Sequence, residues 1–143
     1  MDRADEEYFP PEYKHFPFTE GDLLISRRES GRYAVNKILK VDPIVVRTGE
    51  SINIQGTRFT APCDDWLIVV GMALGDAEYS SEEEAREAAL GGVWKAKVSH
   101  APIRAPGAAE GQVIVGSAPV TASELEGYKV WREAFDKGEA GIF

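Results

Sequence analysis

The amino-acid sequence predicts an α+β protein with a mainly antiparallel sheet and two helices. Short runs rich in β-branched and aromatic residues fill most of 23–74, and turns containing Gly, Pro or Asp separate them. Two later stretches, near 79–90 and 122–137, have apolar residues at helical spacing behind capping sequences. The 143 residues fit one domain, and no internal repeat divides them.

A β-hairpin is the first element predicted. An apolar run at 23–25, a Gly-containing turn at 27–31 and a second β-rich run at 33–41 follow one another. The apolar positions change phase between Val35 and Ile38, which predicts a β-bulge or a strong bend in the second strand.

Further strands are expected from the alternation of apolar and polar residues. Because proline cannot donate a hydrogen bond to a sheet, Asp42-Pro43 is expected to end the second strand, leaving a short third strand at 44–46. Residues 51–59 alternate around a turn at Gly56-Thr57. The run 66–74 is the most hydrophobic segment and predicts a buried central strand.

The first helix has clear signals at both ends. Either Ser80 with Glu83 or Ser81 with Glu84 supplies a capping box, and acidic residues fill the first turn. Gly91-Gly92 ends the helix, because glycine adopts the left-handed conformation that closes a helix.

The final third of the chain predicts two strands and the second helix. Strands are expected at 93–98 and 112–116, with a loop at 107–111 between them. Thr121 and Glu124 form a capping box for the helix at about 122–137. One helix face carries an apolar stripe formed by Leu125, Tyr128, Trp131 and Phe135.

A small barrel is the alternative architecture. Gly21-Asp22 followed by Leu23-Leu24-Ile25 and the run GRYAVNKIL is similar to the first two strands of SH3-like small barrels. This resemblance covers about 25 residues and implies a partly closed barrel with two helices. In either case, residues 1–20 read as an extended, aromatic and Pro-rich arm, in which Pro10 and Pro11 disfavour regular structure, and 21–143 as the domain.

Composition limits the possible environments and partners. With 24 acidic and 16 basic residues the net charge is −8, which disfavours general DNA binding. The run of apolar residues needed to span a membrane is missing, so no membrane association is expected. Cys63 is the single cysteine and the acidic N-terminal stretch does not resemble a signal peptide, so a cytoplasmic location is expected.

Residues that could carry catalysis or bind a metal do not form a recognisable pattern. His15 and His100 are far apart in sequence, and Cys63 is followed by Asp64 and Asp65, whose charges disfavour a reactive thiolate. No metal-ligand spacing or phosphate-binding glycine motif is present. We therefore predict no catalytic residue, no metal site and no cofactor.

The charge is distributed unevenly, and this distribution suggests where a partner could bind. Residues 1–22 have a net charge of −5, 23–60 of +4, and 61–143 of −7. The basic block could line one face of the hairpin beside aromatic residues, or it could pair with acidic residues of the same chain. A second candidate is the apolar end Ile142-Phe143, which could enter a partner's groove or fold back. The candidate interaction residues are Arg27, Arg28, Arg32, Tyr33, Lys37, Arg47, Arg58, Phe59, Ile142 and Phe143.

Three functions are compatible with these observations. The first is a non-enzymatic protein-interaction or regulatory module that binds a protein partner or associates with itself. The second is a small-barrel protein that binds RNA or single-stranded nucleic acid through the basic block at 27–58. The third is an enzyme of unknown reaction that uses carboxylates near Asp64 and Asp65.

Overall fold

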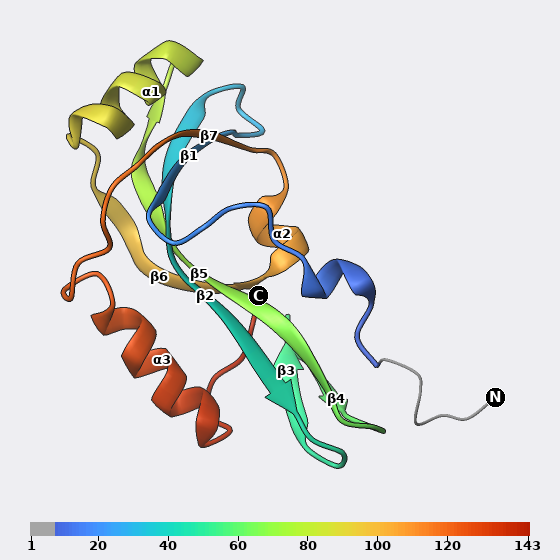
Figure 1. The fold of residues 1–143 in the computed structure, drawn as a ribbon. Helices are drawn as coiled ribbons and strands as arrows, with labels where there is room; N and C mark the ends of the chain where they lie inside the picture. Colours follow the sequence, from blue (N-terminus) through green and yellow to red (C-terminus); the bar gives the residue numbers. More distant parts are fainter. Residues whose placement is uncertain (1–7) are drawn as a thin grey trace.

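A five-stranded antiparallel sheet forms the centre of the computed structural model, which describes residues 8–143 (Figure 1). Its strand order is β6-β5-β2-β1-β7, so β6 and β7 lie at the two edges. No closed barrel is formed by the described residues. The α+β class and the antiparallel sheet are therefore confirmed. The strands are β1 (Asp22–Arg27), β2 (Tyr33–Val46), β5 (Asp65–Tyr79), β6 (Ala96–Arg104) and β7 (Gln112–Ser117).

A separate hairpin, β3 (Ser51–Ile54) and β4 (Thr57–Thr60), lies between β2 and β5 in sequence. Gln55 and Gly56 form its two-residue loop with φ angles of 52° and 80°. Positive φ at both positions is the requirement of a type I′ turn, which suits the twist of a hairpin. The turn is thus one residue earlier than the predicted Gly56-Thr57.

The expectation that Asp42-Pro43 ends the second strand is wrong, because β2 continues through Pro43 to Val46. Beyond Lys37, β2 pairs only with β5. The N–H of Val41 points away from β5 and donates to Glu20, and Pro43 faces the same way two residues later. Its missing N–H therefore removes no bond from the sheet.

The predicted bulge in this strand is present. The register between β2 and β5 shifts between Ala34 and Asn36 and again between Ile38 and Lys40. Each shift lets the long strand bend, so the half of β2 beyond Lys40 diverges from β1 toward the hairpin.

Residues 8–143 contain three α-helices where two were expected. Helix α1 (Glu82–Gly91) is confirmed, with Ser81 accepting a hydrogen bond from the N–H of Glu84. Helix α2 (Ala105–Ala109) was predicted in part as a loop, since its Pro and Gly residues are weak helix formers. A 3₁₀ turn, η2 (Pro11–Lys14), also occurs in the arm, because proline is compatible with a first helical position.

Helix α3 (Glu126–Asp136) begins later than the predicted residue 122. The capping box of Thr121 and Glu124 does form, with each backbone N–H bonded to the other side chain. It closes a turn that precedes the helix, because the Glu124 carboxylate also binds Lys37 of β2 and is held against the sheet. None of the described helices has the length and apolar character needed to cross a membrane.

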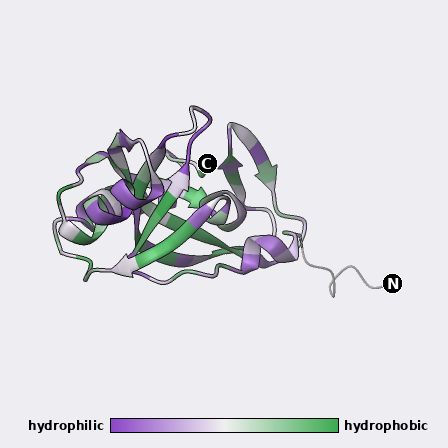
Figure 2. Ribbon diagram, turned by 90° about the horizontal axis from the view of Figure 1, so that it is seen from above, coloured by the Kyte–Doolittle hydropathy of each residue, from purple (hydrophilic) through white to green (hydrophobic). Residues whose placement is uncertain are grey.

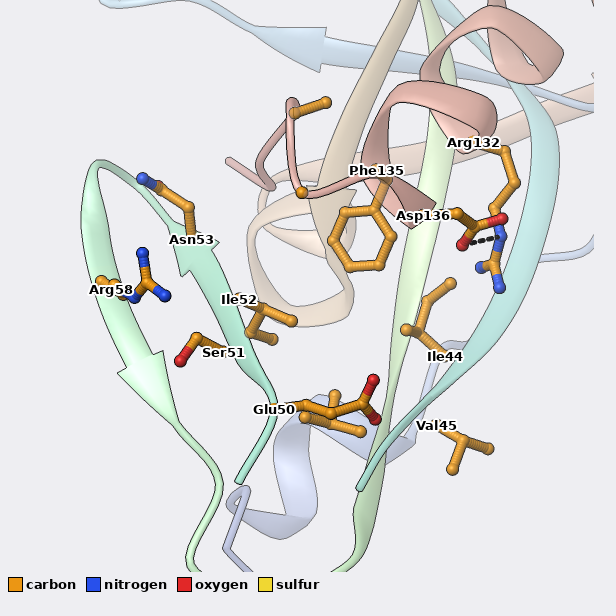
Figure 3. A pocket seen from close by; sticks show the side chains of 13 residues that line it. Ile44, Val45, Glu50, Ser51, Ile52, Asn53, Arg58, Arg132, Phe135 and Asp136 are labelled. Carbon is orange, nitrogen blue, oxygen red and sulfur yellow. Dashed lines mark ion pairs between the residues drawn. The ribbon is translucent and has the colours of Figure 1, made fainter. Parts of the chain in front are cut away.

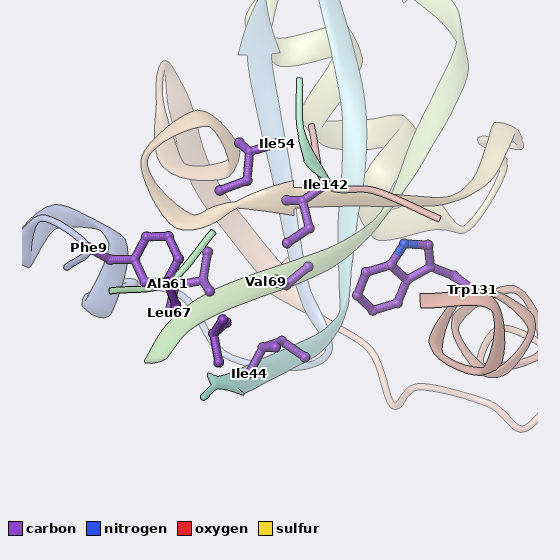
Figure 4. Close-up of a cluster of buried hydrophobic side chains, with 9 residues drawn as sticks. Phe9, Ile44, Ile54, Ala61, Leu67, Val69, Trp131 and Ile142 are labelled. Carbon is purple, nitrogen blue, oxygen red and sulfur yellow. The ribbon is translucent and has the colours of Figure 1, made fainter. Parts of the chain in front are cut away.

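Hydrophobic residues are concentrated on the strands, whereas hydrophilic residues colour much of the helices and loops (Figure 2). One cluster of buried side chains lies under α1, and another on residues of β1, β2, β5 and α2. The largest cluster joins the end of β2, at 44–46, and the start of β5, at 67–69, to the β3–β4 hairpin and α3 (Figure 4). Phe9 of the arm is 3% exposed within this last cluster, so the arm packs on the domain from Tyr8 onward.

Candidate functional site

The predicted basic block is divided between two ends of the molecule. Arg27, Arg28 and Arg32 lie at the turn between β1 and β2, where Arg32 donates to the carbonyl of Glu78. Arg47 and Arg58 lie beyond the opposite end of β2. Fourteen residues of strand separate these groups, a span of roughly 45 Å at about 3.3 Å per residue. The arginines therefore do not share one binding face.

Other cations of the block pair with acidic side chains of the same chain. The Nζ atom of Lys37 lies 2.9 Å from Glu124, and Lys37 is 5% exposed. At the surface, Lys40 lies 3.9 Å from Glu20. Arg47 lies 3.5 Å from Asp64. These three side chains take part in internal charge pairing, one of the two possibilities raised by the sequence.

The remaining candidate residues have different environments. Tyr33 packs against the cluster under α1, and Phe59 packs against the largest cluster beside Tyr8. Ile142 is folded back and only 1% exposed, so its side chain is not available to a partner. Phe143 follows it and is 63% exposed.

Lys37 and Glu124 lie in the wall of a cavity of about 480 Å³ between the sheet and the segments after α1 and β7. Nζ of Lys37 also donates to the carbonyl of Pro119 at 3.0 Å. Burial by itself raises the pKa of Glu124, but hydrogen bonds from Lys37 and from the N–H of Thr121 outweigh it and lower the pKa. The pair therefore stays ionised and ties the segment before α3 to the central strand.

A cleft of about 440 Å³ lies between the end of β2, the β3–β4 hairpin and the last turns of α3 (Figure 3). Its apolar surface comes from three elements, through Ile44 of β2, Ile52 of β3 and Phe135 of α3. Four charged side chains, two acidic and two basic, lie around this surface. They are Glu50, Arg58, Arg132 and Asp136.

The helical side of the cleft is held by a polar network. Arg132 binds Asp42 of β2 at 3.1 Å and Asp136 of its own helix at 3.2 Å. The hydroxyl of Tyr128 donates to the same Asp42 carboxylate at 2.5 Å. Burial, together with this bond, raises the pKa of Tyr128 to about 12, so the phenol keeps its proton. These contacts orient α3 against β2.

Two strand edges open onto the cleft. The backbone N–H of Val45 points the same way as the N–H of Val41, away from β5. No other described strand pairs with this part of β2. On the other side, Asn53 and Gln55 of the hairpin bond to Ile142. The backbone N–H and carbonyl groups of Ser51 point to the same edge of β3 as those of Asn53, but they do not bond to Ile142. Backbone donors and acceptors thus border an apolar surface.

Asp64 and Asp65, near which the enzyme alternative placed its carboxylates, have separate environments. Asp64 is exposed and accepts bonds from the N–H and hydroxyl of Thr48, which lower its pKa. Asp65 is buried and binds Lys14 at 2.6 Å, and also accepts from the N–H groups of Phe9 and Trp66. Burial raises its pKa, but these bonds together lower it. Asp65 therefore serves to anchor the arm.

Candidate metal ligands do not gather in the described part of the chain: no three His, Cys, Asp or Glu residues among 8–143 are placed to hold an ion. His100 packs beside Tyr128 and Trp131, and burial lowers its pKa to about 4. Cys63 lies partly buried just before β5.

Sequence reasoning identified Arg58 of the cleft but missed its other components. Two signals for the cleft were available in the sequence. The helical stripe containing Phe135 needed a surface to pack on, and Asp42, beside Pro43, was an acidic residue within a β-rich run. Comparison of the chain with family models, with curated proteins and with solved structures finds no match.

Proposed function

We propose that this protein is a non-enzymatic interaction module that binds an extended peptide segment of another protein in the cleft between α3 and the β3–β4 hairpin. The observation that carries the proposal is the open strand edge at Val45 beside the apolar surface of Ile44, Ile52 and Phe135. A peptide that adds a strand to a sheet edge obtains affinity from main-chain hydrogen bonds and specificity from its alternate side chains.

The charges around the cleft favour a peptide over a nucleic acid. Glu50 and Asp136 balance Arg58 and Arg132, and Arg132 is already engaged by Asp42 and Asp136. Binding to phosphates requires a surplus of cations, whereas a peptide backbone needs both donors and acceptors. A nucleic acid bound at this end of the molecule would have to use Arg58 together with Arg47, which is paired to Asp64.

The test selects peptides from a random library displayed on phage and compares three proteins by titration with the selected peptides. Val45→Pro removes the N–H that faces the open edge, as Pro43 already does two residues earlier. Val45→Ala shortens the same side chain but keeps the N–H, so it is the matched control. Thermal unfolding of each variant verifies that the fold is retained.

We expect the library to yield peptides that bind the wild-type protein, and we expect them to bind Val45→Pro at least about tenfold more weakly. Tenfold corresponds to about 1.4 kcal/mol, the loss expected when a main-chain hydrogen bond is removed. Val45→Ala should retain most of the affinity. Failure to select any peptide, or equal affinity in all three proteins, would overturn the proposal. Binding of a single-stranded oligonucleotide that weakens steeply with salt would instead support the nucleic-acid function.

A further inference from the structure

The edge strand β7 has an unusual composition for an exposed sheet edge. Its six residues, QVIVGS, carry no charge, in a chain in which 28% of the residues are charged. They contain no proline either, so the strand lacks two of the features with which proteins block pairing at an edge; its register with β1 shifts once, between Leu23 and Leu24. It pairs with β1 on one side and with no strand of residues 8–143 on the other.

Apolar side chains are exposed along this edge. Val113 is 48% exposed and its neighbour Ile114 is 51% exposed. Adjacent residues of a strand point to opposite faces, so both faces of the edge present a large apolar side chain. Leu90 of α1, 58% exposed, lies against β7, since a Cβ atom on Gly116 would stand 2.5 Å from its Cδ2 atom. The apolar surface thus continues from β7 onto α1.

The opposite edge, β6, is protected. It carries Lys97 and Pro102, residues that oppose strand pairing. Its second half is covered by the last residues of the chain, because Phe143 donates to the carbonyl of Pro102 and accepts from the N–H of Arg104. Charge, proline and a covering segment therefore protect β6, whereas the described residues provide none of these three at β7, which suggests that the β7 edge is kept open for a partner.

We propose that the partner at this edge is a second copy of the same chain, whose β7 pairs antiparallel with the first across a two-fold axis near Ile114. An uncharged apolar strand is complementary to itself, because the two-fold axis places apolar side chains beside apolar side chains and opposes no like charges. A basic protein attracted by the net charge of −8 would not be favoured by this neutral edge. The contact continues the sheet through both copies and is independent of the peptide cleft.

Salt dependence distinguishes the two kinds of partner. Two copies with a net charge of −8 each repel one another, and the repulsion is screened as the ionic strength rises. Apolar contact between the two edges does not depend on attraction between opposite charges. The dimer is therefore expected to become more stable at high salt, whereas a complex with a basic partner becomes weaker.

Sedimentation equilibrium of the whole chain at low and high salt tests the proposal. Wild-type protein should approach twice its mass of 15.7 kDa, more completely at high salt. Ile114→Lys, which places a charge at the centre of the contact, should reduce the mass to that of one chain. Val98→Lys is the matched control, since Val98 is 38% exposed on the opposite edge strand and its replacement should leave the dimer unchanged.

A second measurement does not depend on a disruptive substitution. Ile114→Cys places a thiol near the two-fold axis and should form a disulfide between two copies under mild oxidation, whereas wild-type protein, with Cys63 alone, should form far less. Wild-type protein that stays monomeric at its highest soluble concentration would overturn the proposal. A dimer that Ile114→Lys leaves intact, or larger open-ended oligomers, would also overturn it.

Discussion

The N–H of Ile142 donates to the carbonyl of Asn53 at 2.8 Å, and the N–H of Gln55 donates back to the carbonyl of Ile142 at 2.7 Å. Phe143, the next residue, bonds to the backbone of β6 on the other side. Two residues thus connect the five-stranded sheet to the β3–β4 hairpin. The Ile142 side chain completes the cluster formed by the hairpin, α3 and the far half of the sheet (Figure 4).

Replacing Ile142 with Ala should reduce the free energy of unfolding by about 2–5 kcal/mol, because the side chain is 1% exposed and its removal leaves a cavity. Urea denaturation measures the change. Phe143→Ala is the control, since that side chain is 63% exposed and should change stability by less than about 1 kcal/mol. Equal losses in the two variants would contradict the packing seen at Ile142.

Asp65→Asn should be strongly destabilising. It leaves Lys14, whose side chain is 6% exposed, without the carboxylate that lies 2.6 Å away, and loss of one partner of a buried ion pair costs about 3–5 kcal/mol. The double variant Lys14→Met with Asp65→Asn should lose less than the sum of the two single changes, because Lys14 and Asp65 interact directly. Additive losses in the double-mutant cycle would show that the two residues do not interact.

Because of His100, the free energy of unfolding should decrease as the pH is lowered from 6.5 to about 4. Its pKa is lowered to about 4 by burial, so the unfolded chain takes up a proton in this range while the folded protein does not. Below pH 4 both states are protonated and the effect ends. His100→Leu should flatten the slope of unfolding free energy against pH, whereas replacing the exposed His15 with Gln should not. Identical slopes in all three proteins would contradict the burial of His100.

Two glycine substitutions should have opposite effects. A Cβ atom on Gly75 of β5 would stand 2.5 Å from the carbonyl oxygen of Val35, at the bulge of β2, so Gly75→Ala should cost about 1–3 kcal/mol. Gly91 ends α1 and has no neighbour within 4 Å of such an atom, so Gly91→Ala should stabilise the protein by up to about 1 kcal/mol. Thermal unfolding compares the two. A tolerated Gly75→Ala would mean that the bulge can move.

The sequence by itself determined the elements that depend on local chemistry. Helix α1 begins with a cap at Ser81 and ends at glycine, and the β3–β4 hairpin follows from alternation around Gly56. The bulge in β2 was visible as a change of apolar phase after Val35. These signals depend on residues a few positions apart, so the chain shows them without its fold.

The tertiary structure decided the features that join distant segments. Pro43 remains inside a strand because β2 has lost its second neighbour there, and α3 starts late because Glu124 is bound to Lys37. Lys37, Lys40 and Arg47 of the basic block are paired with acids distant in the sequence, which local patterns do not reveal. The cleft, too, combines β2, the hairpin and α3, which meet only after the chain folds back at Ile142. Burial and pairing over long sequence separations override local preference, and they are read only from the folded arrangement.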